Sequence, residues 1–330
     1  MTYLLKPLQA SSLSLSNRLI MPPMATAKAE PDGSVSQAVL DYYQEKSKGG
    51  YFSLIIIEHS FIAPEGKASN RQLSVADDHM LEGLRSLAGV IQRDGSKTVM
   101  QINHAGSATT QKIIGQIPVG PSPIPHPWNG NIPKELTKPE ITKVIQAFQD
   151  AARRVKAAGF DGVEIHSAHG YLLNQFFSPL TNQRTDEYGG TVHNRIRLHL
   201  QVIESVRAVV GDDFPLLLRL GACDFKEGGI TIEDSQTAVR EFEKAGISIL
   251  DISGSFMGYN SPESSAQGYF SPLSAAIKQI VSIPVILTGG ITEPQAAEQL
   301  LATGKADLIG VGRAVLKNSQ WAKQAIEALS

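Results

Sequence analysis

The chain has 330 residues, of which 42% are hydrophobic and 19% are charged, and its formal net charge at pH 7 is −2. These values are typical of a globular protein, and without a basic excess neither nucleic acid nor an anionic membrane is expected as a partner. The single cysteine, Cys223, can form neither an intrachain disulfide nor an iron–sulfur cluster, so redox chemistry needs a bound organic cofactor or a metal site without cysteine.

The amino-terminal stretch MTYLLKPLQASS has no long apolar segment and no cleavage site of a secretory signal. The apolar runs of the sequence are far too short to span a bilayer. We therefore expect a cytoplasmic protein that acts on a small-molecule substrate, and the sequence leaves homo-oligomerisation open.

Short runs of aliphatic residues alternate with longer amphipathic segments along the chain. The short runs predict strands at residues 19–21, 53–57, 98–102, 162–165, 216–220, 249–252, 285–287 and 308–311. Several of them are apolar at consecutive positions, which is typical of strands buried on both faces.

The longer segments show helix patterns with recognisable ends. Residues 36–50 begin at a serine and end at paired glycines, and residues 79–96 place apolar residues three or four positions apart. Residues 137–159 begin with a threonine cap and a proline and end at a glycine, and a threonine start with a glycine end recurs at 231–246 and 292–304.

Each of the eight predicted strands is followed by a helix or by a segment of helix size. Eight such units, with no low-complexity linker between them, predict an α/β protein with a (β/α)8 TIM barrel, one domain over residues 1–330. The alternative is a doubly wound sheet, which would leave the last two units outside the main sheet.

Polar residues or glycines follow nearly every predicted strand. They are PPMAT (22–26), EHS (58–60), NHAG (103–106), HSAHGY (166–171), GACD (221–224), SGS (253–255), TGG (288–290) and GR (312–313). In a (β/α)8 barrel these positions converge on one mouth, so the sequence predicts a ligand site there.

Glycine-rich turns follow the last two strands, where barrels of this type often bind phosphate. Gly289 and Gly290 would let backbone N–H groups approach an anion, and Arg313, after Gly312, could add a charged contact. Alternatively, the glycines only serve tight turns and the arginine is a surface charge. The phosphate interpretation predicts a phosphorylated substrate, PLP or FMN.

His166, His169 and Tyr171 lie directly after the fourth predicted strand. A zinc site is one interpretation, but it needs a third ligand, and Glu164 would point elsewhere if it lies in the strand. A structural role, with imidazoles bonded to neighbouring carbonyl groups, is another. In the third interpretation two neutral imidazoles bind one substrate oxygen and the tyrosine is a general acid, which suits addition of hydride and proton across an activated double bond.

A long motif, HSAHGYLLNQFFSPLTNQRTDEYGG (166–190), is followed by NR at 194–195. Further motifs are NRLIMPPM (17–24), LIIIEHSFIAPEGK (54–67), QINHAG (101–106), LLLRLGACD (216–224) and ADLIGVGRAVL (306–316). In this order, and over nearly the whole chain, they resemble the old yellow enzyme family of NAD(P)H:flavin oxidoreductases.

The resemblance implies a (β/α)8 barrel with non-covalently bound FMN at its mouth and NAD(P)H as electron donor. It also implies a ping-pong cycle in which NAD(P)H reduces the flavin. Flavin N5 then passes hydride to the β-carbon of an enone or a similar alkene, so the implied enzyme is an ene-reductase.

The resemblance also assigns residues to the cofactor. Gln101 would bind the pyrimidine edge of the flavin, and Arg219 would lie near its N1–C2=O region and stabilise the reduced anion. The phosphate would be held at the glycine-rich turns. The full implied cofactor set is Pro23, Met24, Ala25, His59, Gln101, His166, Arg219, Gly289, Gly290, Gly312 and Arg313.

For the substrate, the resemblance implies that His166 and His169 bind a carbonyl oxygen and that Tyr171 protonates the α-carbon. No metal is implied. The segment RTDEYGG (184–190) is expected to be structural, because its charges and paired glycines suit an ordered loop beside the mouth.

The sequence departs from the family pattern at two positions near the flavin. Ala25 stands where relatives carry Thr or Cys and cannot donate a hydrogen bond, and Thr26 is shifted by one residue, which would point it elsewhere. Ala27 replaces a substrate-contacting Tyr of one branch. The arginine extension of that branch and the cysteine-rich half of the larger dienoyl-CoA reductases are also missing from this sequence.

Trp128, in the long segment after the third strand, either covers the pocket or is a surface aromatic residue. Two functional alternatives stay open beside alkene reduction. The same flavin barrel could catalyse oxidative demethylation or the degradation of a ring compound, or a non-redox barrel could use the phosphate site alone. The sequence leaves the physiological substrate and the choice between NADH and NADPH undetermined.

Overall fold

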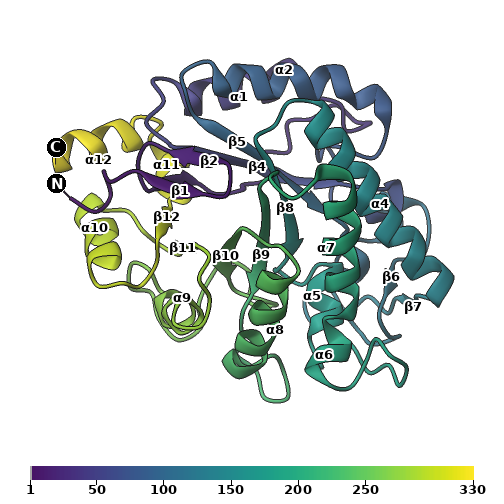
Figure 1. The fold of residues 1–330 in the computed structure, drawn as a ribbon. Coiled ribbons are helices and arrows are strands. Elements are labelled where there is room, and N and C mark those ends of the chain that lie inside the picture. Colours follow the sequence, from purple (N-terminus) through teal and green to yellow (C-terminus); the bar gives the residue numbers. More distant parts are fainter. Residues whose placement is uncertain (1) are drawn as a thin grey trace.

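The computed structural model describes residues 2–330 and contains a closed parallel barrel (Figure 1). The barrel strands, in order around the barrel, are β3 (Leu19–Met21), β4 (Leu54–Phe61), β5 (Lys97–Asn103), β8 (Gly162–Ser167), β9 (Leu216–Gly221), β10 (Ile249–Ser253), β11 (Val285–Thr288) and β12 (Leu308–Gly310). Because β12 pairs with β3, the sheet closes on itself. The predicted (β/α)8 fold is confirmed, and the doubly wound alternative is wrong.

Six strands extend further toward the mouth than the apolar runs predict, four of them by a single residue. β4, β5 and β8 continue to Phe61, Asn103 and Ser167, so His59 and His166 lie inside strands and not in the loops after them. The physical reason is that residues facing the barrel interior near the mouth are polar yet still hydrogen-bonded along the strand. An apolar pattern therefore ends before the strand does.

Helices surround the barrel and follow its strands in alternation (Figure 1). The longer ones are α1 (Gln37–Ser47), α2 (Leu81–Gln92), α4 (Lys138–Ala157), α7 (Arg197–Val210), α8 (Ile232–Lys244), α9 (Ser271–Lys278), α10 (Pro294–Ala302) and α12 (Trp321–Leu329). Shorter ones are α3 (Gln111–Ile114), α5 (Leu172–Phe177), α6 (Val192–Arg195) and α11 (Arg313–Lys317), with 3-10 turns at Pro64–Gly66, Asp78–Met80 and Gly106–Ala108.

The helix ends follow the capping chemistry expected from the sequence. Ser36 accepts a hydrogen bond from the backbone of α1, and Thr137 forms a full capping box with Glu140 at α4. The side chain of Thr231 accepts a hydrogen bond from the backbone of α8, as that of Ser36 does at α1. These caps satisfy backbone N–H groups that the helices themselves leave unpaired.

An antiparallel hairpin, β1 (Leu8–Ala10) and β2 (Leu13–Leu15), closes the amino-terminal end of the barrel (Figure 1). Leu13 and Leu15 are buried against the apolar interior residues at the start of the barrel strands, which are Ile20, Leu54, Ile56, Val99, Leu217, Ile249, Ile286 and Leu308. This apolar plug leaves the opposite end, where the strands finish, as the place for a ligand. A second short pair, β6 (Val119–Gly120) and β7 (Lys134–Glu135), lies between β5 and α4.

The two ends of the chain meet on one side of the barrel, where Thr2 Oγ1 donates a hydrogen bond of 3.2 Å to the backbone oxygen of Leu329 (Figure 1). α12 packs against α10 and α11 beside this contact. Over residues 2–330, none of the helices combines the length and the apolar character that crossing a membrane requires.

Candidate active site

A polar layer lies above the apolar plug inside the barrel. Gln101 and Glu164 are neighbours in the register of β5 and β8, and Arg219 and Asp251 are neighbours in the register of β9 and β10. All four side chains are at most 4% exposed. Burying such groups is costly unless they are paired or receive a ligand, so this layer marks the functional end of the barrel.

Hydrogen bonds orient this layer only in part. Gln101 Nε2 donates to Glu164 Oε1 at 2.7 Å, which fixes the rotation of the amide. Arg219 Nε lies 3.2 Å from Asp251 Oδ2, but its N–H is not aligned on that oxygen. Glu164 Oε2 and both Asp251 oxygens find no hydrogen-bond partner among residues 2–330.

Two buried carboxyl groups therefore share the charge of one arginine. Burial raises the pKa of Asp251 to about 6, against the opposing effect of Arg219. Burial, and then the charge of Asp251, raises the pKa of Glu164 well above its usual value. The cluster can hold a proton at neutral pH. Its net charge would therefore affect a ligand bound next to Arg219.

The position of Glu164 corrects an expectation from the sequence. Glu164 does lie in β8, but it is two residues before His166, and residues two apart on a strand point to the same face. Both side chains therefore face the barrel interior. No group of three or more potential metal ligands occurs in the described part of the chain, so this carboxylate does not complete a metal site there.

His166, His169 and Tyr171 come together at the mouth. The ring centroid of His166 lies 5.1 Å from that of His169 and 5.1 Å from that of Tyr171, with edge-to-face geometry in both pairs. His166 is the second-last residue of β8, and Tyr171 is the residue that precedes the first turn of α5. The strand-to-helix turn thus places all three rings around one point.

The two imidazoles are held differently. His169 has a φ of 57°, a left-handed conformation that turns its ring back toward the barrel, where Nε2 lies 2.8 Å from Ser253 Oγ. His166 is 2% exposed, and its Nδ1 has no hydrogen-bond partner within residues 2–330. Each histidine thus has at least one ring nitrogen without a hydrogen-bond partner among the described residues.

The ionisation of these rings suits hydrogen-bond donation without charge. Burial lowers the pKa of His166 and His169 well below the usual value, and the nearby Arg219 lowers both further. Burial raises the pKa of Tyr171 to about 12. At neutral pH the site therefore presents two neutral imidazoles and a protonated phenol.

His59 lies against Tyr171. The two rings are stacked at 5.4 Å with an interplanar angle of 23°, and Tyr171 Oη lies 3.3 Å from His59 Nε2. The sequence assigns His59 only to the cofactor, whereas the structure places it against the predicted proton donor. Burial lowers the pKa of His59 to about 4, so this ring is neutral as well.

The segment after β3 brings Pro23, Met24 and Ala25 to the mouth, with the first two half-buried and the alanine exposed. Thr26 Oγ1 donates to Glu58 Oε1 at 2.6 Å, and its backbone N–H donates to Glu58 Oε2 at 2.9 Å. Thr26 is therefore bound to Glu58 through both its hydroxyl and its backbone. Its hydroxyl cannot supply the donor that Ala25 lacks.

The predicted phosphate residues gather at the ends of β11 and β12. Gly289 and Gly290 have φ values of 153° and 65°, and a side chain at either would collide with the ring of Tyr269. Arg313 Nη2 donates to Tyr269 Oη at 2.8 Å, and Nη1 donates to Asn260 at 3.3 Å. The guanidinium thus lies beside the glycine pair, joined there by a tyrosine that the sequence did not single out.

An aromatic wall stands on the substrate side of the mouth. His126 Nε2 lies 3.0 Å from the backbone oxygen of Gly170, and its ring packs edge-to-face against Trp128 and Phe256. Trp128 donates its indole N–H to the backbone of Phe256 and stays 50% exposed. Its indole is thus held against Phe256 and His126 while half of its surface stays exposed.

The polar atoms at the mouth fit a flavin. Among residues 2–330, the buried atoms without a hydrogen-bond partner include Glu164 Oε2, His166 Nδ1, Arg219 Nε, Asp251 Oδ1 and Thr288 Oγ1. Unpaired buried groups cost about 1–3 kcal/mol each, so this set is suited to a ligand with several polar atoms along one edge. The arginine and paired glycines at β11 and β12 provide for the phosphate of the same ligand.

Several residues of the site escape a reading of the sequence. Asp251 and Tyr269 each contact a predicted site residue, yet neither belongs to a segment that the sequence singles out, and Ser253, which contacts His169, is singled out only within the polar segment SGS. The available signal is parity: Asp251 and Ser253 alternate with apolar residues in β10, so both face the interior. Tyr269 carries no such signal, because it lies in an irregular loop.

The loop RTDEYGG serves structure, as expected. Arg184 donates to both carboxylate oxygens of Asp186 at 3.0 and 2.6 Å and to the backbone oxygens of Pro121 and Leu136. Gly189 has no room for a side chain, because a Cβ there would lie 2.0 Å from the backbone oxygen of Arg184. These contacts leave the arginine fully engaged within the loop.

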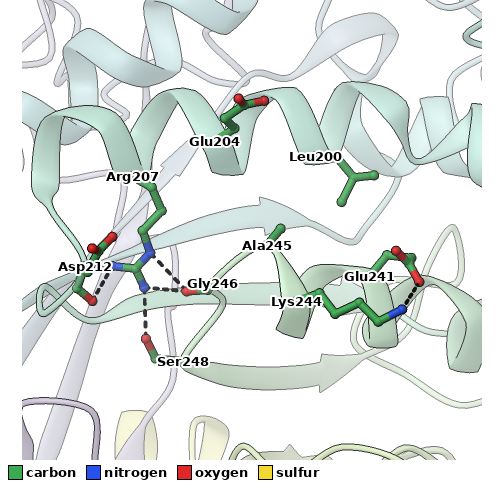
Figure 2. A pocket seen from close by; sticks show the side chains of 9 residues that line it. All are labelled: Leu200, Glu204, Arg207, Asp212, Glu241, Lys244, Ala245, Gly246 and Ser248. Atoms are coloured by element: carbon green, nitrogen blue, oxygen red, sulfur yellow. Dashed lines mark hydrogen bonds and ion pairs between the residues drawn. The ribbon is translucent and has the colours of Figure 1, made fainter.

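A cavity of about 650 Å³ lies on the outer surface between α7 and α8, far from this chemistry (Figure 2). Its arginine, Arg207, donates to the backbone oxygens of Gly246, Gly211 and Phe214 and to Ser248 Oγ. Lys244 pairs with Glu241 at 2.8 Å. Both cations are already bound to protein groups, so the cavity offers little to a ligand.

The fold and this set of residues define a flavin-dependent oxidoreductase barrel. Residues 3–330 match the NADH:flavin oxidoreductase / NADH oxidase family, and the chain belongs to that family. The resemblance to old yellow enzymes is thereby confirmed, and so is FMN as cofactor.

Relatives of two lengths are similar to this chain. It is 44% identical to an NADH oxidase of Thermoanaerobacter brockii over 324 residues, which are 96% of this chain but 49% of that protein. It is 37% identical to an NADPH dehydrogenase of Geobacillus thermodenitrificans over 329 residues, 99% of this chain and 95% of that protein. The chain thus spans about half the length of the first relative and nearly all of the second.

Among solved structures, the old yellow enzyme homologue from Zymomonas mobilis superimposes with a TM-score of 0.87 at 26% identity. The match covers 99% of this chain and 93% of that one. The likeness therefore extends over the complete barrel and its loops.

Proposed function

We propose that this chain is an FMN-dependent ene-reductase that uses NAD(P)H to reduce the C=C bond of enones and related activated alkenes. The observation that carries the proposal is the cluster of His166, His169 and Tyr171 beside the buried Gln101 and Arg219. We further propose that residues 1–330 form one FMN-binding domain.

The two histidines are suited to bind the carbonyl oxygen of such a substrate. Both rings are neutral, lie edge-to-face and keep a ring nitrogen free of contacts with the described residues. Neutral N–H donors strengthen their hydrogen bonds as negative charge grows on the oxygen, which lowers the barrier to addition at the β-carbon. Ser253 fixes the orientation of His169 for this purpose.

Tyr171 is suited to donate the proton to the α-carbon. Its hydroxyl lies in the same cluster as the carbonyl-binding histidines, and its raised pKa of about 12 keeps it protonated under all ordinary conditions. A phenol held in this way acts as a general acid, a contribution worth roughly 10²–10⁴ in rate.

FMN, when bound, supplies the hydride that is added to the alkene. Gln101 and Arg219 would hold the polar edge of the cofactor, with Pro23, Met24 and Ala25 against it. Gly289, Gly290, Gly312 and Arg313 would hold its phosphate. Support for these roles is the unpaired polar atoms of the layer and the position of Arg313 beside the glycine pair.

The proposal is tested with purified FMN-loaded protein, NAD(P)H and cyclohexenone. His166→Ala should lower the rate of the oxidative half-reaction about 10²- to 10³-fold, as loss of one such donor typically does. Tyr171→Phe should slow it about 10²- to 10⁴-fold and leave the reduction of the flavin by NAD(P)H unchanged. Unchanged alkene reduction in both variants would rule out the assigned roles.

The other redox chemistry that a flavin barrel supports is separated by its products. The same holoenzyme is incubated with candidate methylamines and with enones, and both mixtures are analysed. A saturated ketone with consumption of NAD(P)H supports alkene reduction, whereas formaldehyde from an amine supports oxidative demethylation.

A further inference from the structure

His59 makes a contact that a cofactor-binding role does not explain. Its Nε2 lies 3.3 Å from the hydroxyl of Tyr171, and the two rings are stacked at 5.4 Å. The same ring lies 6.3 Å from that of His166. The phenol ring of Tyr171 therefore lies between two histidine rings, those of His59 and His166.

An irregularity in β4 delivers this side chain. The pairing of β4 with β5 shifts between Ile57 and Ser60, so one extra residue is accommodated in the strand. Before the shift, Ile57 packs in the outer core, and Glu58 accepts hydrogen bonds from Thr26. After it, His59 faces inward, where regular alternation would have turned it outward. Bulges of this kind often re-aim a side chain next to an active site.

We propose that His59 is a positioning residue for Tyr171, whose oxygen accepts a hydrogen bond from the Nε2–H of the neutral imidazole while the phenol donates its proton to the substrate. The inference rests on the function proposed above and deepens it. It goes beyond that function by assigning a hydrogen-bond donor to the oxygen of the proton-donating Tyr171.

The chemistry requires such a partner. When Tyr171 acts as acid, its O–H bond breaks, a C–H bond forms at the α-carbon of the substrate, and a phenolate is left. Burial destabilises that phenolate relative to the neutral phenol, which is the physical cause of the raised pKa of Tyr171. A hydrogen bond to an ionised acceptor is stronger than one to a neutral acceptor, so the bond from His59 stabilises the phenolate more than the phenol. Solvent water then returns a proton to the oxygen, and hydroxide leaves.

The surroundings of the pair fix the protonation of His59. The titratable and charged groups nearest to it are Tyr171, His166 and His169 on the β8 side and Arg219 from β9. Burial and the positive Arg219 both disfavour an imidazolium. A neutral ring that donates through Nε2 leaves the tyrosine hydrogen free to point at the substrate.

Two substitutions separate the hydrogen bond from the packing. His59→Phe keeps a flat ring to stack on Tyr171 and removes the donor. His59→Gln removes the stacking and keeps an N–H donor of similar reach. Both are compared with the native holoenzyme in stopped-flow measurements of each half-reaction, with cyclohexenone as the oxidant, and in an ultraviolet titration of tyrosinate by difference against Tyr171→Phe.

His59→Phe is expected to slow the oxidative half-reaction roughly ten- to a hundredfold and to raise the pKa of Tyr171 by about one unit or more. His59→Gln should recover most of both effects. In a Tyr171→Phe background, His59→Phe should have no further effect on the oxidative step.

The inference is overturned if His59→Phe leaves the Tyr171 titration unmoved, or if it slows the oxidative step equally in the Tyr171→Phe background. Either result leaves the function proposed above intact. If instead Tyr171→Phe is as fast as the native enzyme, the assignment of the acid itself is wrong, and the role of His59 falls with it. Wrong folding of His59→Phe is recognised by loss of bound FMN, and His59→Gln then decides through the tyrosinate titration.

Discussion

Arg219 Nε lies 3.2 Å from Asp251 Oδ2 at the centre of the barrel mouth, and both side chains are almost completely buried. The arginine is the group expected to stabilise negative charge on reduced FMN. Its buried carboxylate neighbour offsets part of that positive charge. The net charge of the pair, and not that of Arg219 alone, would then stabilise the reduced cofactor.

Asp251→Asn should therefore raise the midpoint potential of bound FMN. Without the carboxylate, the charge of Arg219 is uncompensated and stabilises the reduced cofactor more. A gain of about 1.4 kcal/mol corresponds to about 30 mV for a two-electron couple. The potential is measured with a reference dye at about pH 8. The native carboxylate is ionised at this pH, because the pKa of Asp251 is about 6. Asp212→Asn, an exposed change of the same type, should have no effect, and an unaltered potential in Asp251→Asn would contradict the coupling.

Arg313→Gln should weaken the binding of FMN without weakening that of riboflavin, which lacks the phosphate. A hydrogen bond to a charged group contributes about 1.5–3 kcal/mol, so the FMN dissociation constant should rise roughly ten- to a hundredfold. Affinities are read from flavin fluorescence on titration of the apoprotein. Arg240→Gln, at an exposed position of α8, is the matched control. Equal losses for FMN and riboflavin would show that Arg313 does not contact the phosphate.

Glu58→Gln should remove a dependence of stability on pH. Burial raises the pKa of Glu58 to about 7 from a usual 4.5, so between these values the folded chain holds a proton that the unfolded chain has lost. This group's contribution is therefore fully present below about pH 4.5, and it falls as pH rises to about 7, by about 3 kcal/mol in total.

Urea unfolding of the native protein and of Glu58→Gln at several pH values measures this effect as a difference. The native protein should lose stability relative to the variant between about pH 4.5 and 7 and no further above. A constant difference across this range would mean that Glu58 titrates normally in spite of its burial.

Leu15→Ala should destabilise the barrel although Leu15 lies far from the mouth. Its side chain is 2% exposed and belongs to the plug that β2 inserts against Ile20, Leu54 and the other interior residues. Deleting a buried leucine typically costs about 2–5 kcal/mol. The change in the free energy of unfolding is measured with urea, with the exposed Ser14→Ala as control. A loss below about 1 kcal/mol would show that the hairpin does not close the barrel tightly.

The eight-strand pattern, most helix caps and the grouping of His166, His169 and Tyr171 could be predicted from the amino-acid sequence. These features are local: a buried strand, a threonine cap or three polar residues in one turn are each written within a few neighbouring positions. The family resemblance added Gln101, Arg219 and the glycine-rich turns, which the fold then placed at one mouth.

Contacts between residues far apart in the chain could not be predicted in this way and follow from the folded barrel. His59 and Tyr171 are separated by 112 positions, and their contact depends on a shift of register in β4 that no apolar pattern announces. The pairing of Arg219 with Asp251, and the turn of Thr26 toward Glu58, likewise follow from how closed parallel strands align. Register and burial are properties of the whole barrel, because each strand is positioned by both of its neighbours. A local sequence pattern therefore cannot predict them.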